Sequence, residues 1–257
     1  MFDRVIIALF IILATVDLWR QQYFINSYYH LKKVLSTHKT IILLMPILGC
    51  VIIAIVDIPI AHFAKNHLNI ARLAIFSKLS LLADGLYLVP TLVITIAMLN
   101  KLQQVIANHN LKQRLQKLIL VLQISFTALI SSGIINGVLK VIFSRQRPII
   151  GFNNWSLFSI LYNPHCHLKG LSYSYNSLPS GHTIIITALI LPILWAYQNN
   201  IWLKCLLIAY YLLIIFCRIY TLNHWSSDVF LASCLGYIIA KICYQGNANK
   251  LSNYYEL

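Results

Sequence analysis

Three short polar segments interrupt the apolar pattern of this chain, and each carries side chains that can bind or transfer a phosphoryl group. The first runs from Lys140 to Arg147 and is followed by Pro148. Because Lys140 and Arg147 are seven residues apart, a continuous helix would present both cations on nearly the same face. The ordinary alternative is a positive flank at the end of a membrane span. Lys140, however, lies inside the apolar stretch, where a cation needs an anionic partner.

The second segment is Pro179-Ser180-Gly181-His182, directly before an uncharged stretch. A Ser-Gly turn that enters a helix offers free backbone N–H groups and the positive helix end to an anion. His182 would stand beside that anion as a proton donor. Taken alone, these four residues are also typical of an ordinary helix cap.

The third segment contains Arg218, His224 and Asp228. His224 and Asp228 are four residues apart and share a helical face. A carboxylate at that spacing can accept the Nδ1 proton of the histidine, fix its tautomer and leave Nε2 free as a nucleophile. A local His–Asp pair at a helix start is the alternative interpretation.

The composition indicates which elements must position these segments. The chain has 257 residues, of which 59% are hydrophobic and 10% charged, whereas soluble domains average about 25% charged residues. The net charge is +14, but the basic residues stand between long apolar runs. This pattern disfavours a soluble enzyme or a nucleic-acid-binding protein and predicts a membrane protein with basic loops.

Apolar stretches predict an all-α membrane bundle of about six transmembrane helices in one domain, residues 40–244. Residues 1–39 form an N-terminal segment, in which Val5–Val16 is expected to be an interfacial helix or, alternatively, part of a tilted seventh span. Residues 245–257 are expected to form a polar tail. The first span is expected to continue past Asp57 to about Ala64. The six predicted spans are Thr40–Val56, Leu79–Leu99, Leu118–Leu139, Thr183–Leu203, Ile201–Ile219 and Trp225–Tyr244.

Alternation of six spans places all three polar segments on one face of the membrane. The opposite face carries the basic loop with Lys101, Lys112, Arg114 and Lys117. Since cytoplasmic loops are enriched in Lys and Arg, the three segments are predicted to face outside, at the inner membrane if the source is bacterial.

The acidic residues and cysteines do not predict a metal site or a cofactor. No two of the six Asp and Glu residues lie within four positions of each other, and no CxxC occurs. Asp57 has no obvious partner and is interpreted as a residue at a span boundary, and Asp84 as a helix cap. The segment Ile149–Leu178, with Lys169, is expected to form a loop that covers a head group.

Together the motifs K-x6-R-P, P-S-G-H and R-x5-H-x3-D resemble those of the type 2 phosphatidic acid phosphatase superfamily. The resemblance runs from Lys140 to Asp228, and it departs where Cys217 stands in place of a serine. It implies that His224 attacks phosphorus to give a phosphohistidine, that His182 protonates the leaving oxygen and that Asp228 orients His224. The residues implied to bind the phosphate are Lys140, Arg147, Ser180, Gly181 and Arg218.

The resemblance and the composition predict a metal-independent phosphatase of the bilayer that acts on a lipid phosphate or pyrophosphate. The candidate substrates are phosphatidylglycerophosphate, phosphatidate, a polyprenyl pyrophosphate and lipid A phosphate. A lipid-to-lipid phosphotransferase is the first alternative, because it would share the phosphohistidine. A non-catalytic lipid carrier on the same fold is the second, although it would have no need of His182, His224 and Asp228.

Overall fold

The computed structural model describes residues 51–152 and 172–252, together with residues 22, 23, 27, 40, 44, 48 and 49. All regular structure in this part of the chain is helical, which confirms the predicted all-α class. The elements are η1 (Ile53–Asp57), α4 (Ile58–His67), α5 (Ile70–Ser80), η2 (Leu81–Ala83), α6 (Gly85–Val105), α7 (His109–Phe143), η3 (Pro148–Ile150), η6 (Tyr173–Tyr175), α9 (Gly181–Ala196), α10 (Ile201–Tyr220), α11 (Ser226–Gly246) and α12 (Ala248–Ser252).

Four helical stretches of the described residues are long and apolar enough to cross a membrane: Ile70–Val105, His109–Ile150, Ile201–Tyr220 and Ser226–Gly246. They contain the second, third and fifth predicted spans and all of the sixth except Trp225, which is the N-cap of α11. The fourth predicted span corresponds to the shorter apolar helix α9, which ends at Ala196. Asn200 follows it and caps α10 by accepting a hydrogen bond from the backbone N–H of Leu203 at 3.0 Å. Most of the first predicted span lies outside the described residues, so the count of six stays a prediction.

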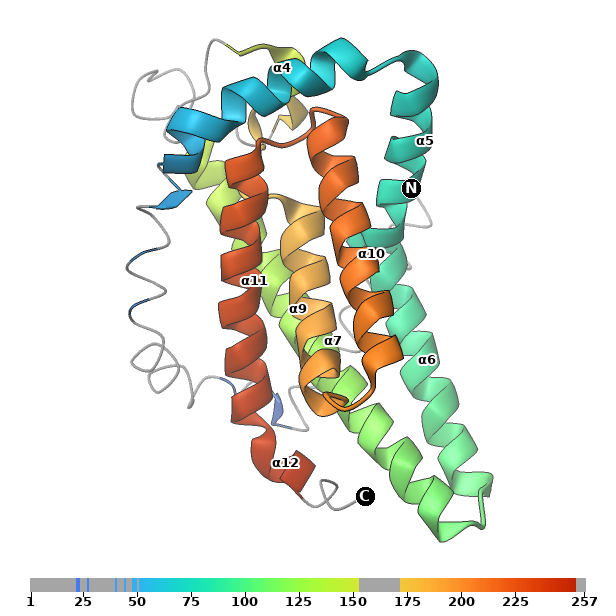
Figure 1. Cartoon of the computed structure of the whole chain (residues 1–257). Coiled ribbons are helices and arrows are strands. Elements are labelled where there is room, and N and C mark those ends of the chain that lie inside the picture. Colours follow the sequence, from blue (N-terminus) through green and yellow to red (C-terminus); the bar gives the residue numbers. More distant parts are fainter. Residues whose placement is uncertain are drawn as a thin grey trace.

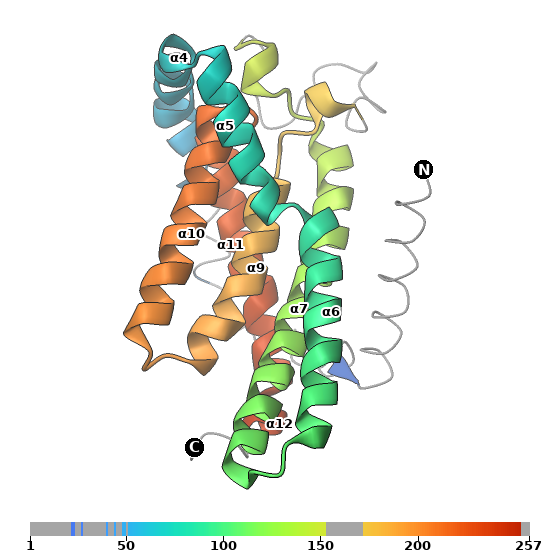
Figure 2. The same cartoon turned by 90° about the vertical axis from the view of Figure 1, so that its right-hand side faces the viewer.

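The helix that follows the first predicted span does not continue it through the bilayer. The π-helical turn η1 and helix α4 run across one end of the bundle (Figures 1 and 2). Pro59 stands in the first turn of α4, and prolines and π-helical turns are common sites of redirection in helices. Residues 58–64 therefore cover the bundle end, which corrects the predicted extension to Ala64. The polar residues Asp57 and Lys65 are carried to that end.

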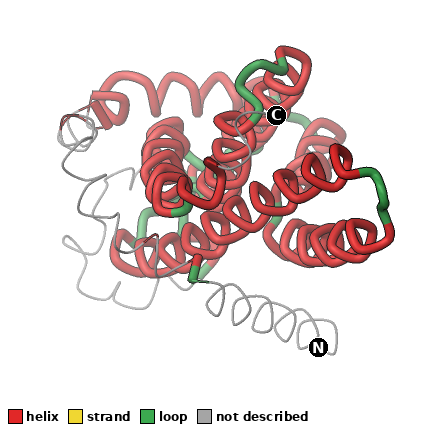
Figure 3. The backbone as a smooth tube through the Cα atoms, turned by 90° about the horizontal axis from the view of Figure 1, so that it is seen from below, coloured by secondary structure: helices red, strands yellow, loops and turns green. Residues whose placement is uncertain are grey.

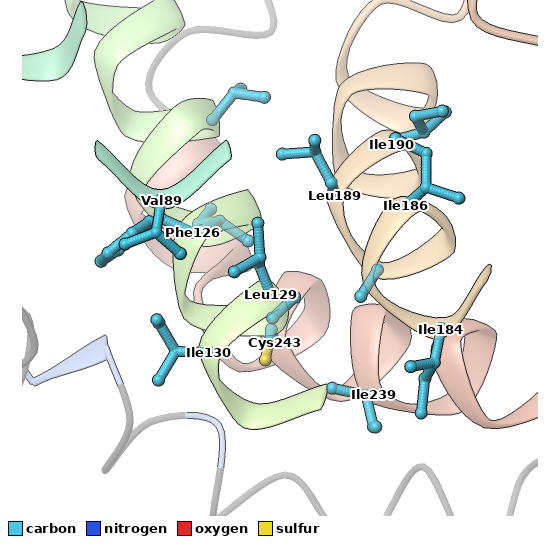
Figure 4. Close-up of a cluster of buried hydrophobic side chains, with 14 of the residues drawn as sticks. Val89, Phe126, Leu129, Ile130, Ile184, Ile186, Leu189, Ile190, Ile239 and Cys243 are labelled. Atoms are coloured by element: carbon cyan, nitrogen blue, oxygen red, sulfur yellow. The ribbon is translucent and has the colours of Figure 1, made fainter. Parts of the chain in front are cut away.

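Helix α9 lies at the centre of the bundle, between α7 and α11. Apolar side chains from the three helices form the core shown in Figure 4, among them Leu129 of α7, Ile186 of α9 and Ile239 of α11. The approach of α9 to α11 is close because Gly236 has no side chain. A Cβ at that position would lie 2.7 Å from Cβ of Thr187. Figure 3 shows the bundle from below, with every described element drawn as helix or loop.

Outer helices expose apolar side chains, as a bundle surrounded by lipid requires. Leu86 and Met98 on α6 and Leu206 and Leu212 on α10 are all at least half exposed. A hydrocarbon solvent removes the penalty that water would impose on these surfaces.

The residues after Tyr244 are not a free polar tail. Helix α11 runs to Gly246, and α12 follows it. Asn247 is buried and donates to the carbonyl of Cys243 at 2.9 Å, and Leu251 is buried against the bundle. This corrects the prediction for residues 245–252; residues 253–257 lie outside the described part.

Candidate active site

Four helix ends meet at the end of the bundle that α4 covers. There α7 and α10 end and α9 and α11 begin, while the turn between α6 and α7 lies at the opposite end (Figure 1). The backbone N–H of Ser180 donates to the carbonyl of Asp228 at 3.3 Å, and that of His224 to the carbonyl of Arg218 at 3.2 Å. The structure therefore brings the three predicted segments together.

Lys140 lies beside the first turn of α9. Its Nζ atom is 3.5 Å from the point that a Cβ on Gly181 would occupy. Ser180 is the N-cap residue of α9, yet its side chain makes no capping hydrogen bond to the helix backbone. The start of α9, which Ser180 leaves without a side-chain cap, thus lies next to the ammonium of Lys140, a setting that suits an anion.

Arg147 occupies a different kind of position from the one the sequence predicts. Helix α7 ends at Phe143 because Ser144 adopts a left-handed conformation with φ of 44°. Arg147 therefore belongs to the loop beyond the helix and shares no helical face with Lys140. Its guanidinium is held by Asn176 Oδ1, at 3.1 Å from Nε and 2.7 Å from Nη2, and by Asn223 Oδ1, at 3.0 Å from Nη1. Tyr173 covers its face, with the ring centroid 4.0 Å away.

Arg218 is buried in the last turn of α10. Its Nη1 donates to Oγ of Ser80 at 3.2 Å, and Ser80 comes from the end of α5. Its Nε has no hydrogen-bond partner among the described residues. A buried guanidinium that is only partly satisfied is suited to bind the oxygens of an anion.

His224 lies between α10 and α11 with 2% of its surface exposed. Its Nδ1 is 2.6 Å from the backbone carbonyl oxygen of Ser177. A carbonyl can only accept a hydrogen bond, so Nδ1 carries the proton and Nε2 presents a lone pair. Burial lowers the pKa of His224 well below its ordinary 6.5, and the positive charges of Arg218, Arg147 and Lys140 lower it further. This shift favours the neutral imidazole, which is the form that can act as a nucleophile.

Asp228 reaches His224 indirectly. Its Oδ2 is 3.8 Å from Nδ1, beyond hydrogen-bond distance. Oδ2 instead accepts from Oγ of Ser177 at 2.5 Å and from the backbone N–H of Trp225 at 2.9 Å. The direct bond expected from the four-residue spacing is thus replaced by a path through Ser177, because the carbonyl of that residue accepts the hydrogen bond from Nδ1–H.

Two further buried charges were missed by the sequence interpretation. Arg145 has no exposed surface, and it contacts Oδ1 of Asp228 at 2.5 Å and Oδ2 of Asp57 at 2.9 Å. Asp57 also accepts from the backbone N–H of Ser227 at 2.9 Å. Asp57 is therefore part of a buried ion cluster, which corrects its interpretation as a boundary residue. The available signal was an acid inside an apolar stretch, since a buried carboxylate needs a partner.

His182 is the second residue of α9, half-buried and within electrostatic reach of Arg218, Lys140 and Arg147. Asp84 caps α6 by accepting from the N–H of Leu86 at 2.9 Å, as predicted. Among residues 51–152 and 172–252, no three His, Cys, Asp or Glu side chains gather in a way that could hold a metal ion. The predicted head-group residue Lys169 lies outside the described residues. The three cations can bind the oxygens of a phosphoryl group, and Nε2 of His224 can accept its phosphorus.

The sequence model of the PAP2 superfamily matches residues 122–252, just over half of the chain. The chain belongs to the PAP2 superfamily. Its fold is similar to the crystal structure of Aquifex aeolicus LpxE, with a TM-score of 0.51 and 20% sequence identity over 74% of this chain and 94% of that one. No curated protein sequence matches the chain significantly.

As a PAP2 protein with four apolar helices of spanning length, the chain is an integral membrane protein. The family and the fold support a phosphatase that acts on membrane lipids. The matched region begins inside α7 and contains every site residue predicted from the sequence. It does not include Asp57 or Ser80, which lie earlier in the chain.

Proposed function

We propose that this PAP2 protein hydrolyses a lipid phosphate monoester or pyrophosphate through a phosphohistidine on His224. The single observation that carries the proposal is the setting of that residue. Its Nδ1 bonds to the carbonyl of Ser177 at 2.6 Å, and its charged neighbours include Lys140, Arg147 and Arg218. A neutral imidazole with a free Nε2, next to cations that bind phosphate oxygens, is arranged for attack on phosphorus.

Phosphoryl transfer then proceeds in two steps. In the first, the Nε2 lone pair of His224 forms a bond to phosphorus, the bond to the leaving oxygen breaks, and His182 gives that oxygen its proton. Burial, together with the charges of Arg218 and Lys140, lowers the pKa of His182. The imidazolium form that donates the proton therefore depends on the negative charge of the bound phosphate. In the second, water loses a proton to His182 and attacks phosphorus, the P–N bond breaks, and inorganic phosphate leaves. Lys140, Arg147 and Arg218 offset the charge of the equatorial oxygens in both steps.

Two features support a lipid as the phosphate carrier. The cation cluster lies at the ends of apolar helices, so the phosphate would bind at head-group depth. The neighbouring helices α6 and α10 expose apolar side chains along their length. A lipid can then reach the site from the bilayer while its chains stay in hydrocarbon, so discrimination depends on the head group.

The site is proposed to face the extracytoplasmic side. Lys101, Lys112 and Arg114 lie at the opposite end of the bundle, around the turn between α6 and α7 (Figure 1). Cytoplasmic loops are enriched in such residues. The bias is moderate, since Lys65 and Arg72 lie on α4 and α5 at the site end.

The decisive experiment measures phosphate release by the purified protein from the four candidate lipids: phosphatidylglycerophosphate, phosphatidate, a polyprenyl pyrophosphate and lipid A phosphate. His224→Ala is the blank. His109→Ala is the matched control, because His109 is exposed at the far end of α7. We expect full activity in the control and none in the blank, with an acid-labile phosphoenzyme in the wild type alone. Undiminished turnover by His224→Ala would remove the assignment, and transfer of phosphate to an added lipid alcohol in place of water would identify a phosphotransferase.

A further inference from the structure

Arg145 is the centre of a buried ion cluster behind the proposed nucleophile. It follows the left-handed turn at Ser144 that ends α7, and its side chain has no exposed surface. One guanidinium nitrogen contacts Asp228 at 2.5 Å and the other contacts Asp57 at 2.9 Å. Both carboxylates are also fully buried.

The cluster fixes three parts of the fold to one another. Asp57 belongs to η1, Arg145 to the loop after α7, and Asp228 to the first turn of α11. Asp57 also accepts from the backbone N–H of Ser227 at 2.9 Å and from its hydroxyl at 2.5 Å. Buried ion pairs contribute little net stability, and a best-attested role for buried polar groups is to select one arrangement among several. Here the cluster holds the Asp228 carboxylate in one position.

A continuous set of hydrogen bonds leads from this cluster to the nucleophile. Arg145 holds Oδ1 of Asp228, and Oδ2 of Asp228 accepts from the hydroxyl of Ser177 at 2.5 Å. The carbonyl of the same Ser177 lies 2.6 Å from Nδ1 of His224. Each member of the path is buried, so water does not compete for these bonds.

We propose that Arg145 is a positioning residue for His224, acting through Asp228 and the side chain of Ser177. The inference rests on the proposed phosphohistidine mechanism and adds to it the means by which the tautomer and direction of the imidazole are set. Asp57 restrains the second arm of Arg145. Arg145, Asp228 and Ser177 need not touch the phosphate to act in this way.

The path makes Ser177 the informative position. Ser177→Ala keeps the backbone carbonyl that binds Nδ1 but removes the hydroxyl that ties this carbonyl to Asp228. If Asp228 instead oriented His224 by direct contact, loss of that hydroxyl would leave the imidazole in place. Ser177→Ala is also a mild change, because Asp228 retains its bonds to Arg145 and to the N–H of Trp225.

The test is a double-mutant cycle of Ser177→Ala, Arg145→Lys and the double variant. The probe is the lipid that the four-lipid panel shows to be hydrolysed fastest. We expect each single change to lower kcat and the rate of phosphoenzyme formation about tenfold or more, by analogy with the residues that orient metal-binding histidines. KM should stay within about twofold, since no phosphate ligand is lost, and the double variant should fall little below the worse single variant because both changes act through Asp228.

Matched controls are Ser172→Ala and Arg114→Lys, which make the same substitutions at exposed positions. Three results would each overturn the inference. They are losses in kcat that multiply in the double variant, a change confined to KM, and normal turnover by Ser177→Ala. Where Arg145→Lys does not yield folded protein, Ser177→Ala alone decides the matter. Activity in His224→Ala would refute the proposed function itself, whereas an inactive His224→Ala with an additive cycle would refute only the role of Arg145.

Discussion

Replacement of Gly236 by alanine tests whether the close approach of α9 to α11 holds the site together. The added Cβ would lie 2.7 Å from Cβ of Thr187 and 2.9 Å from the backbone carbonyl oxygen of Ile184. Ordinary contact begins at 3.4 Å. The carbonyl belongs to the backbone of α9 and cannot rotate away, so the two helices have to separate.

Overpacking of this kind costs about 1–3 kcal/mol, and the rigid backbone contact places Gly236→Ala toward the upper end. The higher helix propensity of alanine offsets about 0.5–1 kcal/mol, which leaves a net loss of about 2 kcal/mol. The separation would also affect catalysis. Gly236 is eight residues, or about 12 Å, below Asp228 on α11, and the carbonyl of Asp228 accepts from Ser180 of α9 at 3.3 Å.

The assay compares thermal unfolding in detergent and kcat for Gly236→Ala and Gly137→Ala. Gly137 is a matched control because it lies in the interior of α7 and nothing is within 4 Å of its Cβ position. We expect Gly137→Ala to unfold at or above the wild-type temperature and Gly236→Ala to unfold below it with reduced kcat. Equal stability of the two variants would show that α9 and α11 are not packed as described.

Three other predictions concern the chemistry and its orientation. Burial and the charges of Arg218 and Arg147 hold the pKa of His224 well below 6.5, so the neutral form persists as the pH falls through 6.5. We therefore expect kcat/KM not to fall between about pH 8 and pH 6.5. An acid limb with an apparent pKa at or above 6.5 would contradict this. Since cations of the chain offset the phosphoryl charge, activity should survive excess EDTA and be inhibited by vanadate, whereas loss of activity in EDTA that added Mg²⁺ restores would refute metal independence. An impermeant maleimide added to intact cells should label Ser172→Cys above the wild-type background but not Lys112→Cys, and the reverse pattern would invert the topology.

The convergence of the site could be predicted from the sequence because it depends on helix count and chain direction alone. Each of the three segments stands at an end of an apolar stretch, and antiparallel neighbours bring alternate ends together. The positions of Lys140, Ser180 and His224 follow from this. The place of Arg147 does not, because the end of α7 depends on the left-handed conformation of Ser144. Serine carries no strong signal for that conformation, in contrast to glycine.

The Asp57–Arg145–Asp228 cluster could not be read from the sequence. Asp57 and Arg145 are 88 residues apart, and nothing in a single sequence pairs two charges across that separation. The spacing of His224 and Asp228 also predicted a direct bond, because periodicity places the two side chains on one face. It says nothing of the third group, Ser177, whose carbonyl occupies the Nδ1 position. Local spacing therefore singled out His224 and Asp228, which the structure places 3.8 Å apart, but not the bonds that join them.

Cys217 stands where the family motif has a serine, directly before Arg218. The sequence places doubt on phosphate binding there, since a thiol is a weaker hydrogen-bond partner than a hydroxyl. In the structure, the neighbouring Arg218 already donates a hydrogen bond to the hydroxyl oxygen of Ser80, which lies on α5, 138 positions away in the sequence. Cys217 is fully buried, and its carbonyl accepts from the hydroxyl of Thr221 at 2.6 Å, as the serine carbonyl would. The Arg218 guanidinium therefore has a hydroxyl partner on α5, whichever residue stands at position 217.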